Sequence, residues 1–240
     1  MVYSYFGANV HYKFINRQSK SVLVFLHGWG RSGEDFVRYE ELFDDRSILT
    51  LDFPPFGQST FDPKKWNIYS YANMLISLCD HLNINSIDLI GHSFGGRVAL
   101  IVCALSSSLV HSCIFTSSAG IKPRRSVGYR LKVIRYKIYK SFGGKKLGGS
   151  KDYKALSTEM RNLFKNIVNS HLDDYAKIVK KPTLIVWGEN DKETPLYMAK
   201  RLNKIIKNSS LVILNNSGHF AFLEKKLEFF NAVNSFLEGI

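Results

Sequence analysis

The chain has 240 residues, of which 45% are hydrophobic and 22% are charged. These fractions are typical of a globular protein and exclude a disordered or fibrous chain. No apolar run approaches the roughly 18 residues of a membrane span, and the N-terminus does not resemble a secretory signal, so we expect a cytoplasmic protein. The three cysteines, without C-x-x-C spacing, indicate a reducing compartment and argue against a cysteine-based zinc site.

The formal net charge of +13 is concentrated in one part of the sequence. Residues 121–154 contain twelve basic residues and one acid, whereas the remainder of the chain is close to neutral. A basic patch of this kind is one signature of nucleic-acid binding. The catalytic motifs described below decide whether this basic segment indicates nucleic-acid binding or another role.

Short apolar runs alternate with longer segments of helical periodicity along most of the chain. We predict strands at 2–6 and 10–15 (a hairpin), 21–26, 47–51, 86–90, 110–116, 182–187 and 211–214, and helices at 32–43, 69–82, 94–106, 195–206 and 222–237. Strands that are apolar throughout are covered on both faces, so this order predicts an α/β fold with a mostly parallel sheet between helices. Functional sites in such sheets form at the carboxyl ends of the strands.

A candidate nucleophile lies where one predicted strand meets the next helix. Gly91-His92-Ser93-Phe94-Gly95 matches the G-x-S-x-G motif, in which a strained turn exposes the serine hydroxyl above the sheet. Side chains two positions before and after the serine would collide in this turn, which explains both glycines. The alternative is a serine that only caps a helix between two incidental glycines.

A serine nucleophile needs a base to take its proton, and the base needs an acid to orient it. Candidates for both follow later strands. His219 follows the last predicted strand in a short loop, and we predict it as the base. His92 lies inside the elbow and should point away from Ser93. Asp191 lies deepest in the loop after 182–187 and is the predicted acid, whereas Glu189 and Glu193 are expected to be solvated.

The oxyanion of a tetrahedral intermediate requires two N–H donors. Phe94 follows the nucleophile at a helix N-terminus and supplies one of them. Trp29, between the glycines of His27-Gly28-Trp29-Gly30, should supply the other.

Taken together, HGWG, DFPPFGQS, GHSFGG, WGEND and GHF, in this order, resemble the α/β-hydrolase superfamily and, within it, the small lidded esterase-like members. The resemblance implies an α/β-hydrolase core at 1–120 and 175–240, with a basic helical cap inserted at 121–174. The order Ser93, Asp191, His219 is also that of this superfamily. Pro55 departs from the glycine usual in the second motif and should stiffen that loop.

The glycines of the first motif also allow a dinucleotide-binding interpretation. Gly28, Gly30 and Gly33 form G-x-G-x-x-G after a strand, and Asp52 ends the next strand. Against this, Trp29 and Arg31 crowd the turn that a pyrophosphate must approach. This interpretation also leaves the predicted triad unexplained.

The basic part of the predicted cap contains one amphipathic pattern. Val127, Leu131, Ile134 and Ile138 share a helix face, with arginines and lysines over the remaining surface. The interpretations left open are a lid with a solvated outer face, steering of anionic substrates or acyl carriers, and weak contact with a membrane surface. Nucleic-acid binding is not expected.

From these residues we expect a serine hydrolase of small carboxylic esters, some of them anionic, that needs no metal or organic cofactor. The substrate pocket should be lined by residues of the first motif, the elbow and the last loop: His27, Gly28, Trp29, His92, Phe94 and Phe220. The same triad also serves thioesterases, lactonases and C–C bond hydrolases, and a ligand receptor that retains the triad is the non-enzyme alternative. The sequence does not indicate an oligomeric state.

Overall fold

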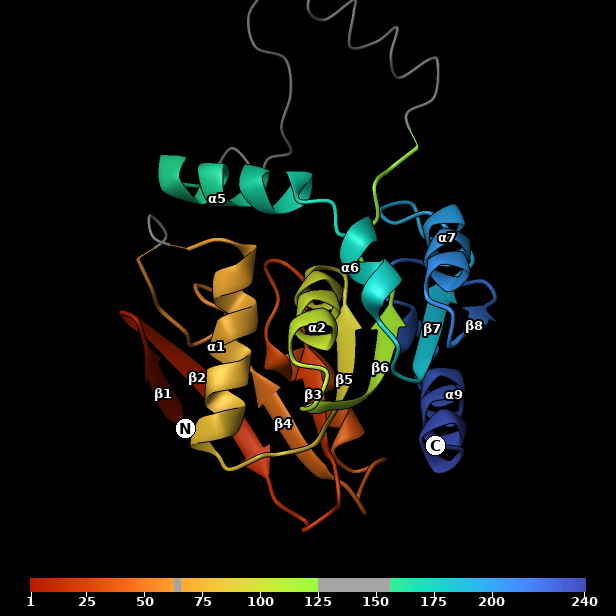
Figure 1. The fold of residues 1–240 in the computed structure, drawn as a ribbon, viewed down its shortest axis with the longest axis horizontal. Helices are drawn as coiled ribbons and strands as arrows, with labels where there is room; N and C mark the ends of the chain where they lie inside the picture. Colours follow the sequence, from red (N-terminus) through yellow and green to blue (C-terminus); the bar gives the residue numbers. More distant parts are fainter. Residues whose placement is uncertain (63–65, 125–155) are drawn as a thin grey trace, which may run out of the picture.

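The computed structural model describes residues 1–62, 66–124 and 156–240. These residues form an eight-stranded sheet of order β1-β2-β4-β3-β5-β6-β7-β8 (Figure 1). The first two strand pairings, β1–β2 and β2–β4, are antiparallel and the others are parallel. The strands are β1 (Val2–Tyr5), β2 (Ala8–Ile15), β3 (Val22–Leu26), β4 (Ser47–Leu51), β5 (Ile87–His92), β6 (Val110–Thr116), β7 (Thr183–Gly188) and β8 (Ser209–Leu214).

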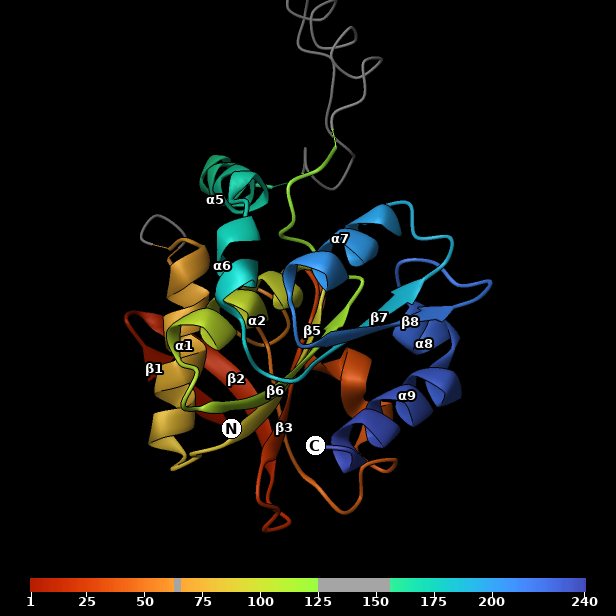
Figure 2. The same ribbon diagram turned by 45° about the vertical axis from the view of Figure 1, so that its right-hand side comes forward.

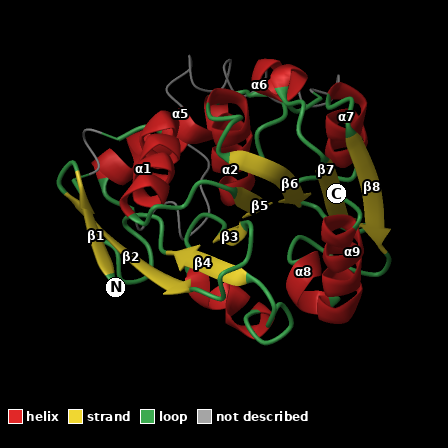
Figure 3. Ribbon diagram, turned by 60° about the horizontal axis from the view of Figure 1, so that its bottom comes forward, coloured by secondary structure: helices red, strands yellow, loops and turns green. Residues whose placement is uncertain are grey.

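Helices cover both faces of this sheet (Figure 2). Those described are the 3-10 helix η1 (Gly33–Tyr39), α1 (Ile68–His81), α2 (Phe94–Leu105), α5 (Thr158–Asn169), α6 (Asp173–Ile178), α7 (Tyr197–Ile205), α8 (Ala221–Glu224) and α9 (Lys226–Glu238). Buried residues of α1, α2 and α7 pack in one core, and those of η1, α8 and α9 pack in a second core on the other face. Figure 3 shows the same three layers, with helices in red and strands in yellow.

The apolar strands form because successive side chains enter opposite cores. In β3, Val24 and Leu26 belong to the core beneath α1 and α2, whereas Phe25 belongs to the core beneath η1 and α9. All three are fully buried, and burying a side chain of this kind contributes about 1.5–3 kcal/mol. The predicted α/β fold with a mostly parallel sheet is therefore confirmed.

Two predicted helices differ from the structure. The segment predicted as a helix over 32–43 is a 3-10 helix that ends at Tyr39. Phe36 and Tyr39, three residues apart, both stack on Phe25, and side chains at this spacing lie directly above one another in a 3-10 helix. The predicted helix 222–237 is divided into α8 and α9 at Lys225, whose backbone leaves the helical conformation (φ −125°, ψ 51°).

The cysteines also differ from expectation. Cys103 of α2 and Cys113 of β6 form a disulfide, which does not fit the reducing compartment inferred from the cysteine count. Count and spacing did not reveal this pair, because the turn between α2 and β6 brings the two residues together. Cys79 is buried, and burial raises the pKa of its thiol to about 12.

The predicted amphipathic helix at 126–140 lies outside the described residues. The chain is described again from residue 156, and the expected boundary at 174 falls inside α6. The division into core and cap stays a prediction. Arg201 of α7 donates to the backbone oxygen of Lys122 at 3.0 Å and forms an ion pair with Asp173, so α7 holds both the chain just before the gap and the first residue of α6. In the described ranges, no helix is long and apolar enough to cross a membrane.

Candidate active site

Ser93 lies in the turn between β5 and α2 and has a backbone conformation that L residues rarely adopt (φ 50°, ψ −107°). Glycines make this turn possible. A Cβ on Gly91 would lie 2.7 Å from the Cα of Gly96, and a Cβ on Gly95 would lie 2.1 Å from the backbone oxygen of Leu26. The collisions expected from the sequence are therefore with backbone atoms, which have no other position to take.

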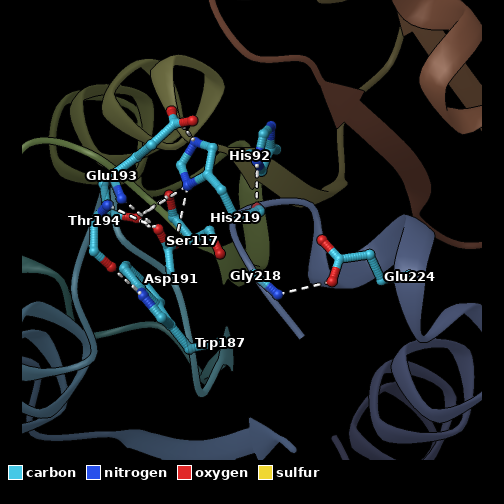
Figure 4. Close-up of polar contacts among 9 residues, drawn as sticks. All are labelled: His92, Ser117, Trp187, Asp191, Glu193, Thr194, Gly218, His219 and Glu224. Atoms are coloured by element: carbon cyan, nitrogen blue, oxygen red, sulfur yellow. Dashed lines mark hydrogen bonds and ion pairs between the residues drawn. The ribbon is translucent and has the colours of Figure 1, made fainter. Parts of the chain in front are cut away.

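Asp191 and His219 come from the loops after β7 and β8 and meet beyond the carboxyl ends of these strands (Figure 4). The Nδ1 of His219 lies 2.9 Å from the Oδ2 of Asp191, and both residues are buried. The backbone N–H groups of Glu193 and Thr194 each donate to the other carboxylate oxygen, Oδ1, at 2.9 Å. The carboxylate is thus held by its own loop in a fixed position against the imidazole.

The ionised form of Asp191 is favoured at this position. Burial by itself raises the pKa of this carboxyl, but hydrogen bonds from His219 and Thr194 outweigh burial and lower the pKa below its ordinary value. A carboxylate so placed accepts a hydrogen bond from the N–H at Nδ1 and leaves the Nε2 of His219 facing the cavity described below.

Thr194 is a part of this arrangement that the sequence analysis missed. Its hydroxyl lies 2.7 Å from the Oδ2 of Asp191, 3.0 Å from the backbone oxygen of Ser117 and 3.3 Å from the Nδ1 of His219. The indole of Trp187 donates to the backbone oxygen of Thr194 at 2.6 Å. The signal in the sequence is the position of a threonine three residues after the aspartate, where its N–H reaches the carboxylate.

Glu193 was expected to be solvated, and its side chain is 68% exposed. Its Oε2 nevertheless lies 3.3 Å from the Nε2 of His219. Ser93 and His219, both of them described residues, are not joined by a hydrogen bond here, although both line the same cavity. The other acid of this loop, Glu189, accepts a hydrogen bond from the backbone N–H of Asn216 at 3.1 Å.

His92 packs behind His219, with 4.8 Å between the ring centroids. Its Nε2 lies 3.0 Å from the backbone oxygen of His219, so its side chain faces the base rather than Ser93. Burial lowers the pKa of His92 to about 3 and keeps the ring neutral. As predicted for the pocket, His92 lines the cavity.

His27 was expected to line the pocket, and this expectation is wrong. The ring is fully buried behind the loop, where it accepts a hydrogen bond from the N–H of Phe53 at 2.7 Å through Nε2. Its Nδ1 therefore carries the proton and donates to the oxygen of Gly28 at 2.7 Å. Because the C=O and N–H of a trans peptide point in opposite directions, His27 also fixes the direction of the N–H of Trp29.

A cavity of about 970 Å³ lies over Ser93 and His219. Gly28, Trp29, Phe94 and Phe220 line it, as the sequence analysis expected. Most of the remaining wall is apolar. It includes Phe56 from the loop after β4, Leu156 just before α5, and Phe164, Ile167 and Val168 of α5. In Figure 1, α5 lies across the top of the molecule, beyond the sheet edge that carries the site.

Arg97 of α2 attaches α5 to the core. Its buried guanidinium donates to the backbone oxygens of Ile167 at 3.0 Å, Val168 at 3.3 Å and Ser170. Carbonyls at a helix C-terminus lack partners within the helix and carry partial negative charge, so an arginine satisfies them well. Burial lowers the pKa of Arg97 to about 10, which keeps it charged at neutral pH.

Of the residues in the dinucleotide interpretation, Gly33 and Asp52 are hydrogen-bonded to each other. Asp52 is buried and accepts hydrogen bonds from the backbone N–H groups of Gly33 at 2.8 Å and Gln58 at 2.9 Å. Both carboxylate oxygens thus hold the loops after β3 and β4. No group of three or more His, Cys, Asp or Glu side chains suited to a metal ion occurs in the described part of the chain.

Several known proteins are similar to this chain in sequence or in structure. A family model described as "alpha/beta hydrolase fold" matches residues 21–144 and 132–226. A Bacillus subtilis protein named uncharacterized hydrolase YugF is 28% identical over 89% of this chain and 88% of its own length. Lipase 3 of a Moraxella species is 23% identical over 91% and 78%. The solved esterase of Exiguobacterium antarcticum superposes with a TM-score of 0.76 at 20% identity, covering 97% of this chain and 96% of that one.

Proposed function

Because the chain belongs to the α/β-hydrolase fold family and is a hydrolase related to esterases and lipases, we propose that it cleaves carboxylic esters through an acyl-enzyme on Ser93. The observation that carries the proposal is the buried pair of Asp191 and His219, at 2.9 Å, facing a cavity that also contains the strained turn of Ser93. Strain of this kind persists where the surrounding structure imposes it, and it occurs often at active sites.

In the proposed reaction the hydroxyl of Ser93 attacks the ester carbonyl while the Nε2 of His219 takes its proton. Asp191 stabilises the imidazolium and keeps the ring oriented. This step needs a hydrogen bond between Ser93 and His219, and such catalytic contacts often tighten only in the complex with substrate.

The N–H groups of Trp29 and Phe94 are proposed to stabilise the oxyanion of the tetrahedral intermediate. The hydrogen bond from His27 to the oxygen of Gly28 supports this role for Trp29, because it orients that peptide. When the intermediate collapses, Nε2 gives its proton to the departing alcohol. Water then attacks the acyl-enzyme with His219 again as base, which releases the acid and restores Ser93.

The apolar wall of the cavity supports an uncharged acyl chain as the part of the substrate that it encloses. Steering of anionic substrates and membrane contact were expected of residues outside the described ranges, and both stay proposals. So does the cytoplasmic location.

The test is the turnover of p-nitrophenyl acetate and p-nitrophenyl butyrate by the wild type and by Ser93→Ala. We expect the substitution to lower kcat by at least about 10³-fold, because alanine cannot form the acyl-enzyme. The melting temperature of the variant checks that it folds. Activity that survives in a folded Ser93→Ala protein would refute the nucleophile, and a folded wild type without turnover on any ester would favour the receptor alternative.

A further inference from the structure

Three charged side chains line the described part of the cavity: Arg31, Arg97 and Glu193. The guanidinium of Arg31 is paired with Asp35 one helical turn later, through its Nε at 2.9 Å and through one terminal nitrogen. Arg97 donates to three backbone oxygens of α5 and the residue after it. The charges of both arginines are therefore already compensated by protein groups.

Glu193 differs from the two arginines. Its backbone N–H is fixed by Asp191, yet its side chain extends into the cavity opening and is 68% exposed. Among the described residues its ion-pair partner is His219, whose Nε2 lies 3.3 Å from the Oε2 of Glu193. This contact is an ion pair only while the imidazole is doubly protonated, because in the neutral ring with its proton on Nδ1 a lone pair faces the carboxylate.

The position of this carboxylate relates it to one part of the substrate. In the proposed reaction Nε2 is the atom that returns a proton to the departing alcohol. A carboxylate 3.3 Å from Nε2 therefore lies beside the leaving group, whereas the apolar wall formed by Trp29, Phe94 and α5 suits the acyl chain.

We infer that Glu193 is a specificity residue that favours esters whose alcohol carries a positive charge, such as amino or ammonium alcohols. This inference rests on the proposed function and adds a substrate class to it. A cationic alcohol gives the carboxylate a permanent partner that neutral His219 does not. An anionic alcohol meets repulsion from Glu193 and finds the two described arginines of the cavity already engaged.

The test compares two esters of the same size, butyrylcholine and 3,3-dimethylbutyl butyrate, which differ in a quaternary nitrogen or carbon. The ratio of their kcat/KM values is compared between variants, because acyl group and leaving-group shape are shared and the different intrinsic reactivity of the two esters is the same for every variant. We expect Glu193→Gln to lower this ratio about two- to fivefold from its wild-type value, the range of a partly exposed ion pair. Added salt should also lower the wild-type ratio.

Glu189→Gln is the matched control, since it removes the same charge from the same loop at a residue that does not line the cavity. It should keep the wild-type ratio. A ratio that is the same in Glu193→Gln as in the wild type overturns the inference, while hydrolysis of the neutral ester still supports the proposed function. If the wild type hydrolyses neither ester, the proposed function fails and the inference fails with it.

Discussion

The two halves of the candidate site are held in place by different interactions. The loops after β7 and β8, which carry Asp191 and His219, are fixed by hydrogen bonds that involve the side chains of Asp191 and Thr194. The turns after β3 and β5, which carry Trp29 and Ser93, are packed so closely that a side chain on Gly91 or Gly95 would overlap backbone atoms.

This difference follows from what each half has to do. The acid and base must be oriented through their polar atoms, and hydrogen bonds give that orientation directly. The nucleophile must stand on a strained turn, and close packing maintains strain because neighbouring backbone leaves no alternative position. We therefore expect substitutions of the packed glycines to act on stability, and substitutions in the hydrogen-bonded half to act on catalysis.

The largest effect is expected for Gly95→Ala, which adds a single methyl group to the glycine-packed half. Its Cβ would lie 2.1 Å from the oxygen and 2.5 Å from the carbon of Leu26, and 2.8 Å from the oxygen of His27. Since all three are backbone atoms, β3 and α2 must separate. We expect the free energy of unfolding to fall by about 3 kcal/mol or more, measured by urea denaturation.

The matched control is Gly239→Ala, at the end of α9. There a Cβ would meet the oxygen of Ser235 at 3.5 Å, an ordinary contact, so stability should change by no more than about 0.5 kcal/mol. Equal losses for the two variants would mean that close packing does not distinguish the elbow from an ordinary helix end.

The next prediction concerns the buried imidazole within the glycine-packed half. Burial lowers the pKa of His27 to about 4, whereas the ordinary pKa of a histidine in an unfolded chain is 6.5. As the pH falls below 6.5 the unfolded chain binds a proton that the folded protein takes up only near pH 4. This contribution to stability is therefore complete above pH 6.5 and is lost between pH 6.5 and 4.

Between pH 7.5 and 4.5 we expect His27 to account for a loss of about 2–3 kcal/mol in the free energy of unfolding. His27→Gln should retain a donor and an acceptor while removing the titration, so its stability should fall less over the same range. His92, with a pKa of about 3, supplies pH dependence that remains in the variant. An unchanged slope in His27→Gln would show that its protonation is not linked to folding.

The sequence predicted the fold because β-α alternation and apolar strands are local patterns. It predicted which residues follow each strand for the same reason. In the structure Ser93, Asp191 and His219 all lie beyond the carboxyl ends of the strands. The sequence misplaced His27 and missed Thr194, because the role of each depends on a partner in another loop. His27 accepts a hydrogen bond from the N–H of Phe53, and Thr194 bonds to the backbone oxygen of Ser117. The pair of Cys103 and Cys113 depends on a tertiary contact in the same way.

The smallest effect is expected for Thr194→Val, which removes one hydroxyl from the hydrogen-bonded half at nearly constant volume. Asp191 keeps its bonds from His219 and from two backbone N–H groups, so the carboxylate stays in place but loses one of its donors. We expect kcat for p-nitrophenyl butyrate to fall about tenfold, equivalent to about 1.4 kcal/mol, with little change in KM.

Thr194→Ser is the rescuing control, because it restores the hydroxyl and should recover most of kcat. A purely structural role for the methyl group would instead lower the melting temperature of Thr194→Ser, which lacks that methyl, and leave the kcat of Thr194→Val close to the wild-type value. If Thr194→Val retains wild-type kcat, the hydroxyl does not position Asp191, and the backbone N–H groups of its own loop are enough to orient the acid toward His219.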